Sequence, residues 1–163
     1  MNSDVLLRKH VLNLLNGGMA YPTFDEIVSK FPQDKINKRF PHGKYNAWQL
    51  LEHIRLTQFA TLDFMISQAY IELPWPSAYW PDISKKATKK DLKDTIDKFK
   101  KDRLQIEKLL MSPKIDLFSK VPNGTTQTFL REFLLIADHN SYHLGEFAIM
   151  RQVMKTWPKN HKD

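Results

Sequence analysis

The sequence contains no cysteine. This absence excludes disulfide bonds, a thiol nucleophile, an iron–sulfur cluster and every metal site built on thiolates. A metal ion bound by this chain would therefore be held by nitrogen and oxygen atoms, so histidine and carboxylate side chains are the groups to examine.

Long apolar runs are also absent. The longest strongly apolar run, Phe133 to Ala137, is far shorter than the roughly 20 residues that a membrane-spanning helix needs. Arg8, Lys9 and His10 interrupt the N-terminal apolar stretch, so it does not have the apolar region of a signal peptide. These absences favour a cytoplasmic protein without a membrane partner.

The composition is that of an ordinary globular protein, with 42% hydrophobic and 26% charged residues among 163. No repeat or low-complexity tract divides the chain, and a chain of this size can bury a core of its own. We therefore predict a single domain over residues 1–163, with its core in about residues 5–155.

Helical periodicity dominates the sequence, and strand signals are scarce. Only the segment from Asp116 to Val121 could form a short extended strand. Glycine, proline and N-cap residues bound four long periodic segments and one short one. The long segments run from Ser3 to Leu15, from just after Asn46 to about Ala69, from Thr88 to just before Pro113, and from near Thr128 to before Pro158, and the short one covers Phe24 to Lys30. We predict an all-α fold, a four-helix bundle with long crossover loops.

The net charge of +7 raises the question of nucleic-acid binding. Basic residues gather in the segment 85–108, but acidic residues are interleaved among them. Asp94 and Lys98, like Asp97 and Lys101, have the i,i+4 spacing that supports a helix. The segment is therefore typical of a solvated helix face, and without an uncompensated basic stripe a nucleic-acid partner is not favoured.

Two of the six histidines, His139 and His143, lie four residues apart in the last predicted helix. Four residues turn a helix by about 400°, so both rings share one face and lie roughly 6 Å apart along the axis. At this spacing both rings can reach one metal ion. The same stripe contains apolar residues, so we expect the pair to point inward; they are Leu135, Ile136, Phe147 and Met150.

His53 lies on a stripe of the second long helix with Leu50, Ala60 and Phe64, so it is also expected to face the interior. A buried imidazole costs free energy unless its nitrogen atoms find partners. A shared divalent metal would supply the partner, and three protein ligands with open water positions are typical of a catalytic site. Histidine pairs at this spacing also occur by chance. The alternative interpretation is therefore that each ring is buried with its own hydrogen-bond partner and binds no metal.

Two neighbours of His143 bear on this hypothesis. Gly145 costs about 1 kcal/mol relative to alanine inside a helix, which is tolerated where another backbone or a ligand must approach closely. Glu146 is three residues beyond His143. It is a candidate fourth ligand, an acceptor for an imidazole N–H or a general base, and we take it as the catalytic candidate; a solvent-facing side chain is the alternative.

Other aromatic and histidine residues have weaker contexts. The aromatic segment Tyr70 to Trp80 either closes part of a pocket or only caps the bundle core. His10 and His42 lie in no informative pattern, and His161 is expected to be solvated in a basic tail.

Four segments resemble the DinB-like superfamily, also called the DinB/YfiT-like metalloenzymes. The most specific are Asn46 to Ile54 and Ala137 to Gly145, and Leu73 to Pro81 and Gln127 to Glu132 are similar to one branch of the family. The resemblance implies a four-helix bundle with a metal at one end of its core. It places the three ligands on His53, His139 and His143, with nickel, zinc or iron as the ion.

The resemblance also implies a range of functions. Characterised members include thiol transferases that use bacillithiol or mycothiol, a mycothiol-dependent isomerase and metal-dependent hydrolases, and dimers are frequent. Because dimers are frequent in the family, a homodimer is one expected state. Members often carry glutamine where this chain has Glu146.

We accordingly predict a metal-dependent enzyme that acts on a small molecule such as a low-molecular-weight thiol. Thiol S-transfer is preferred on the resemblance alone, and hydrolysis comes next. The alternatives are a non-catalytic metal-binding stress-response module and, less favoured, a nucleic-acid binder whose binding would weaken with added salt.

Overall fold

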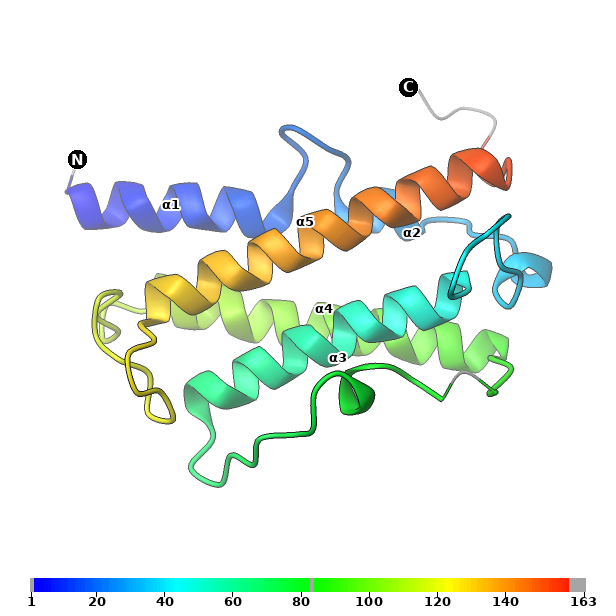
Figure 1. Ribbon diagram of the computed structural model, residues 1–163. Helices are drawn as coiled ribbons and strands as arrows, with labels where there is room; N and C mark the ends of the chain where they lie inside the picture. The colour runs from blue at the N-terminus through cyan, green and yellow to red at the C-terminus, as the bar shows by residue number, and fades with distance from the viewer. Residues whose placement is uncertain (1, 83, 159–163) are drawn as a thin grey trace.

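The computed structural model describes residues 2–82 and 84–158, and these residues form helices joined by long loops (Figure 1). The described residues contain no strand, and the segment 116–121 contributes only an isolated bridge between Lys120 and Thr128. The helices are α1 (Ser3–Asn16), α2 (Phe24–Val28), α3 (Ala47–Ile66), α4 (Lys89–Met111) and α5 (Phe129–Val153), with 3-10 turns η1 (Gln33–Lys35) and η2 (Ser77–Tyr79). The predicted all-α fold is confirmed.

Local capping explains where the helices begin. Thr88 and Asp91 form a reciprocal capping box at the start of α4, and Asn46 and Gln49 form another at the start of α3. Both starts agree with the sequence prediction. At the end of α1, Gly17 adopts a φ of 68°, which an L-residue with a side chain rarely takes.

Two predicted helix ends were too late, and side chains from distant segments account for both. The α3 helix ends at Ile66 rather than Ala69, where the Asn123 amide donates to the backbone oxygens of Phe64 and Ser67, both at 2.8 Å. The α2 helix ends at Val28 rather than Lys30, and there Arg151 donates to nearby carbonyls. Periodicity within a segment carries no information about such long-range partners.

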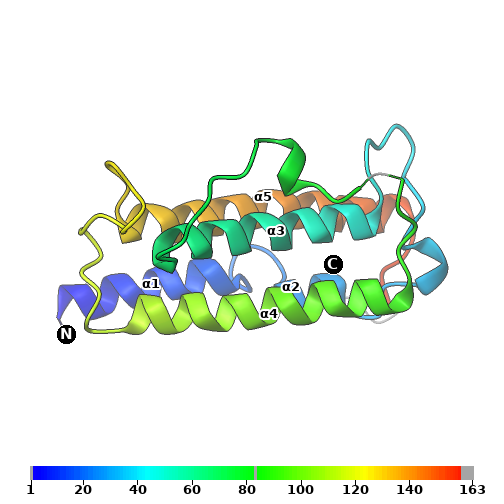
Figure 2. The same cartoon turned by 90° about the horizontal axis from the view of Figure 1, so that it is seen from below.

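The four long helices form a bundle in which α3 and α1 each contact both α4 and α5. Figure 1 shows α1 and α5 running in one direction and α3 and α4 in the other. Figure 2 shows α3 and α5 in one layer and α1, α2 and α4 in a second layer. Because α3 and α4 follow each other in sequence but run the same way, the chain between them, described over residues 67–82 and 84–88, returns along the length of α3 (Figure 1).

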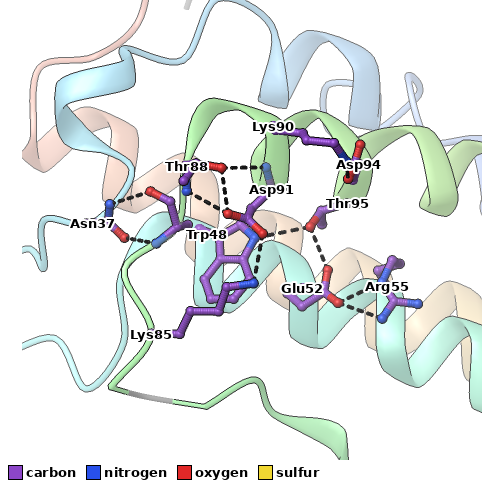
Figure 3. Close-up of polar contacts among 11 residues, drawn as sticks. Asn37, Trp48, Glu52, Arg55, Lys85, Thr88, Lys90, Asp91, Asp94 and Thr95 are labelled. Carbon is purple, nitrogen blue, oxygen red and sulfur yellow. Dashed lines mark hydrogen bonds and ion pairs between the residues drawn. The ribbon is translucent and has the colours of Figure 1, made fainter.

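The end of this crossover segment is fixed by polar contacts (Figure 3). The side chain of Asn37 exchanges two hydrogen bonds of 2.8 Å with the backbone of Ala87. The side chain of Lys85 pairs with Asp91 at 2.8 Å, in the first turn of α4. These contacts hold the end of the returning chain against the loop before α3 and the first turn of α4.

A second set of contacts in Figure 3 joins α3 to α4. The Trp48 indole N–H donates to Thr95 Oγ1 at 3.2 Å, and the Thr95 hydroxyl donates to Glu52 Oε2 at 2.6 Å. Glu52 also pairs with Arg55 at 2.6 Å. These bonds set the rotation of α3 about its axis, so that His53, the residue after Glu52, faces α5.

The exposed side of α4 carries ion pairs. Lys90 pairs with Asp94, and Lys93 pairs with Asp97. The two carboxylates therefore bind the lysines four residues earlier in the helix, and not those four residues later that the sequence pattern singled out. No helix among residues 2–82 and 84–158 combines the length and the apolar character needed to cross a membrane.

Candidate metal centre

The helices α3 and α5 bring three histidines together. His53 lies in α3 and is buried, and His139 and His143 lie on successive turns of α5 and are half-buried. The Nε2 atom of His53 is 3.2 Å from Nε2 of His143 and 3.3 Å from Nε2 of His139. The sequence predicts this convergence, and the structure places all three ligand atoms within 4.8 Å of one another.

Hydrogen bonds fix the proton on two of these rings. The His53 Nδ1–H donates to the backbone oxygen of Tyr79 at 2.7 Å, and the His143 Nδ1–H donates to Glu146 Oε2 at 2.5 Å. Because a carbonyl and a carboxylate oxygen can only accept, each Nδ1 carries a proton, and in the neutral form of either ring the lone pair lies on Nε2. Two lone pairs 3.2 Å apart repel unless a cation lies between them.

The donor set therefore fits a divalent metal ion. Nitrogen ligands about 2.1 Å from one ion lie about 3.0–3.4 Å from each other in tetrahedral or octahedral geometry. The separations of His53 Nε2 from His143 and His139 Nε2, 3.2 and 3.3 Å, fall in this range, and all three ligand atoms lie within 4.8 Å of one another. Imidazole nitrogen suits zinc, iron and nickel, whereas an oxygen-rich site would suit magnesium or calcium.

Burial favours the neutral form of His139 and His53. It lowers the pKa of His139 to about 4, with further contributions from His143 and His53. Burial also lowers the pKa of His53, although its hydrogen bond to the Tyr79 carbonyl opposes the change. A neutral imidazole is the form that binds a metal, so the environment prepares these residues for ligation.

Glu146 and Tyr45 support His143 from outside the ligand set. Glu146 uses Oε2 for His143, and its Oε1 accepts a 2.6 Å hydrogen bond from the Tyr45 hydroxyl. Burial and then Glu146 raise the pKa of Tyr45, so its hydroxyl stays protonated and donates. Of the roles open to Glu146, acceptor of an imidazole N–H is the one with a contact in this structure, and its action as a base stays a prediction.

The returning segment 67–88 covers the site with aromatic rings. The Trp80 ring stacks on His53 with centroids 3.8 Å apart and planes 2° apart, and the Tyr45 ring stacks on Trp80 with centroids 5.0 Å apart. The aromatic segment 70–80 stands out in the sequence, but the histidine that it covers does not follow from it. Tyr45 has no sequence signal, because no local pattern links residue 45 to a carboxylate 101 residues away.

Two residues of the last helix differ in part from the expectation. A Cβ atom built on Gly145 would meet nothing within 4 Å, so no other described segment approaches the glycine closely, and the approach of a ligand stays a prediction. Leu135, on the stripe of the histidine pair, is 37% exposed and lines a cavity rather than the core. His10 and His42 are exposed and lie outside the cluster, and His161 lies outside the described residues.

Two cavities lie along the junction of α3 and α5, and the apolar one adjoins the site through His139. The apolar cavity has a volume of about 230 Å³, and the polar cavity has about 360 Å³. Thr61 lines both. The apolar cavity is lined by Thr57, Trp75, Leu135, Ile136 and His139, and the polar cavity by Tyr70, Glu72, Tyr79, Asn123, Gln127, Arg131 and Glu132. His139 thus joins the candidate metal centre to space large enough for part of a small molecule.

Comparison with known proteins agrees with this geometry. A sequence model of the DinB superfamily matches residues 19–147, a range that includes all three histidines. No curated protein and no solved structure matches the chain. The family match covers most of the sequence, and the helical fold is consistent with it, so the chain belongs to the DinB superfamily.

Proposed function

We propose that this protein is a metal-dependent enzyme in which His53, His139 and His143 hold one divalent ion. The observation that carries the proposal is the meeting of the His53 and His143 Nε2 atoms at 3.2 Å while both Nδ1 protons are engaged elsewhere. We further propose nickel, zinc or iron as the ion, since each binds imidazole.

The chemistry follows from an open ligand set. A divalent ion held by three imidazoles lowers the pKa of a water molecule or thiol that reaches it, which supplies a nucleophile near neutral pH. Glu146 holds the His143 ring in one tautomer and increases its basicity by accepting its Nδ1 proton. The Tyr79 carbonyl does the same for His53, and Trp80 covers the face of that ring and excludes water.

We propose a small organic molecule as substrate, with transfer of a thiol as the preferred reaction and hydrolysis as the second candidate. The apolar cavity beside His139 supports this proposal, because a non-catalytic metal site needs no adjoining space for a ligand. The preference for thiol transfer over hydrolysis comes from the family alone.

Elemental analysis of the purified protein tests the metal site. We expect about one divalent ion per chain in the wild type. Single alanine variants of His53, His139 and His143 should each lose most of this metal. His10→Ala and His42→Ala are matched controls, because both side chains are exposed and lie outside the cluster. A variant of any proposed ligand that keeps the full metal content would overturn its assignment.

Activity is tested separately on the metal-loaded protein. A panel of thiols with electrophilic acceptors, and a panel of activated esters and amides, should yield turnover that disappears in His143→Ala. Turnover of only the thiol substrates would indicate transfer, and turnover of only the esters and amides would indicate hydrolysis. A protein that holds its metal but turns over neither panel would support the non-catalytic alternative.

A further inference from the structure

The polar cavity contains charges of both signs although it lies away from the three histidines. Arg131 projects from the first turns of α5 and pairs with Glu132 at 2.7 Å. The Glu132 carboxylate is almost wholly buried, whereas 56% of the Arg131 side chain is exposed. Arg131 therefore neutralises a buried charge with one nitrogen and keeps the rest of its guanidinium available to solvent.

A second carboxylate reaches the same cavity from the crossover segment. Glu72 is exposed and lines the cavity with Tyr70 and Tyr79. Glu72 lies close enough to Tyr70 to affect it: the pKa of Tyr70 is raised by burial, by Tyr79 and by Glu72. Arg131, Glu132 and Glu72 together give the cavity one cation and two anions.

Uncharged hydrogen-bonding groups complete the lining. The Asn123 amide nitrogen donates to the backbone oxygens of Phe64 and Ser67, which leaves its Oδ1 as an acceptor. Gln127 spends its Oε1 on the backbone N–H groups of Thr125 and Thr126, which leaves its N–H groups as donors. The cavity also lies at the N-terminal turns of α5, where the helix dipole favours an anion.

These features match a ligand end that carries both a carboxylate and an ammonium group. The geometry points to the polar cavity as the subsite for a zwitterionic, amino-acid-like end of the substrate, with the carboxylate on Arg131 and Gln127 and the ammonium group on Glu72. An anion alone would meet two carboxylates, and a cation alone would meet Arg131, so neither is complemented as well.

The rest of the ligand follows from the arrangement of the two cavities. From Glu132 to His139 the helix rises about 10 Å over seven residues. The apolar cavity occupies this interval, with Ile136 and Trp75 among its walls. The substrate class is therefore an amino acid with an extended apolar side chain, whose far end reaches the histidines. This inference rests on the proposed function, because only a reactive centre at His139 makes that far end the reacting group.

Three probes of matched chain length test the subsite. L-2-Aminooctanoate carries both charges, octanoate lacks the ammonium group and heptylamine lacks the carboxylate. Isothermal titration of the protein as purified should give at least tenfold tighter binding for the zwitterion than for either single-charge probe. Equal affinity for all three probes, or a preference for octanoate or heptylamine, would overturn the assignment.

Variants identify the residues responsible. Glu72→Gln should reduce the zwitterion to the affinity of octanoate, and its exposed position makes misfolding no concern. Removal of Arg131 alone would leave Glu132 buried without its partner, so both are replaced in Arg131→Gln/Glu132→Gln, which should reduce the zwitterion to the affinity of heptylamine. Thr61→Leu, at the junction of the cavities, should weaken all three probes about tenfold. Unchanged selectivity in both charge variants would contradict the inference.

The same titrations in His143→Ala separate this inference from the metal proposal. Loss of metal with preserved selectivity would show that the subsite is real and independent of the ion. Preserved metal in the ligand variants together with selectivity for the zwitterion would overturn the metal assignment and leave the subsite standing.

Discussion

Glu146 Oε2 accepts the Nδ1 proton of His143 at 2.5 Å, while the Tyr45 hydroxyl holds the other oxygen of the same carboxylate at 2.6 Å. The carboxylate therefore fixes the orientation of a proposed ligand and increases the electron density on its Nε2. Outer partners of this kind change metal affinity by roughly 10–100-fold when they are removed. Two predictions follow from this relationship, one for the carboxylate and one for the hydroxyl.

Replacement of the carboxylate should weaken metal binding without removing a ligand. In Glu146→Gln the amide oxygen can still accept from His143, but the negative charge is lost, so we expect metal affinity to fall about tenfold. Competition with a chromogenic chelator measures the change. If Glu146 were instead a ligand, Glu146→Ala would lower the metal content as strongly as a histidine variant does.

Removal of the Tyr45 hydroxyl should have a smaller effect in the same direction. Tyr45→Phe keeps the ring that stacks on Trp80 but frees one oxygen of Glu146, so we expect a few-fold loss of metal affinity. Tyr21→Phe is the control, because that hydroxyl bonds to the Leu14 carbonyl, away from the histidines. Equal losses in the two variants would contradict a specific role for Tyr45.

Trp80 should report metal binding by fluorescence. Its ring lies 3.8 Å from the His53 ring, so a paramagnetic ion such as nickel held by His53 should quench its emission. We expect titration with nickel to quench the wild type strongly and Trp80→Phe less, because Trp75, which lines the same cavity as His139, can still respond. Trp157→Phe serves as control, since that indole lies over Arg151 and should leave most of the quenching in place. Quenching as strong in Trp80→Phe as in the wild type would contradict an ion held by His53.

The metal-free protein should lose stability on acidification because of His139. Its pKa is lowered from 6.5 to about 4 in the folded chain, so between these values the unfolded chain takes up a proton that the folded chain does not. The stability contribution is therefore present above pH 6.5 and lost as the pH falls toward 4. Urea denaturation in the presence of a chelator should show a smaller loss between pH 7 and pH 4.5 in His139→Gln than in the wild type. An identical loss in both would show that other groups account for it.

Local signals were enough to predict the helices and the three histidines. The capping residues Asn46 and Thr88 mark helix starts through bonds within three residues, so sequence alone locates them. The spacing of His139 and His143 likewise fixes their common face. Whether His53 meets them depends on the packing of α3 against α5. The inward-facing apolar stripe of each helix predicts this meeting correctly.

The groups around the histidines could not be predicted, because they arrive through long-range topology. Tyr79 and Trp80 reach His53 only because α3 and α4 run in parallel and the crossover must return along α3 (Figure 1). The same limit explains the error at the end of α3, where Asn123 caps carbonyls more than 50 residues away. Sequence periodicity predicts which face of each helix is buried, but not which loop residues lie against that face.

Arg151 should be essential for stability although it lies outside the metal site. Its buried guanidinium donates to the backbone oxygens of Ile27, Ser29 and Thr156 at 2.6–2.9 Å, which joins α2 and the end of α5. Burial lowers the pKa of Arg151 to about 10, so it remains charged at neutral pH. Arg151→Met keeps much of the volume but leaves the carbonyls unpaired, and we expect the free energy of unfolding to fall by about 3–5 kcal/mol.

The conservative variant distinguishes charge from geometry at this position. In Arg151→Lys a single ammonium group cannot reach carbonyls on both sides as the planar guanidinium does, so most of the loss should remain. Urea denaturation followed by circular dichroism measures both variants, with Arg39→Met as the control because that side chain is exposed. If Arg151→Lys were as stable as the wild type, charge alone would suffice and the three directed hydrogen bonds would not be what holds α2 against α5.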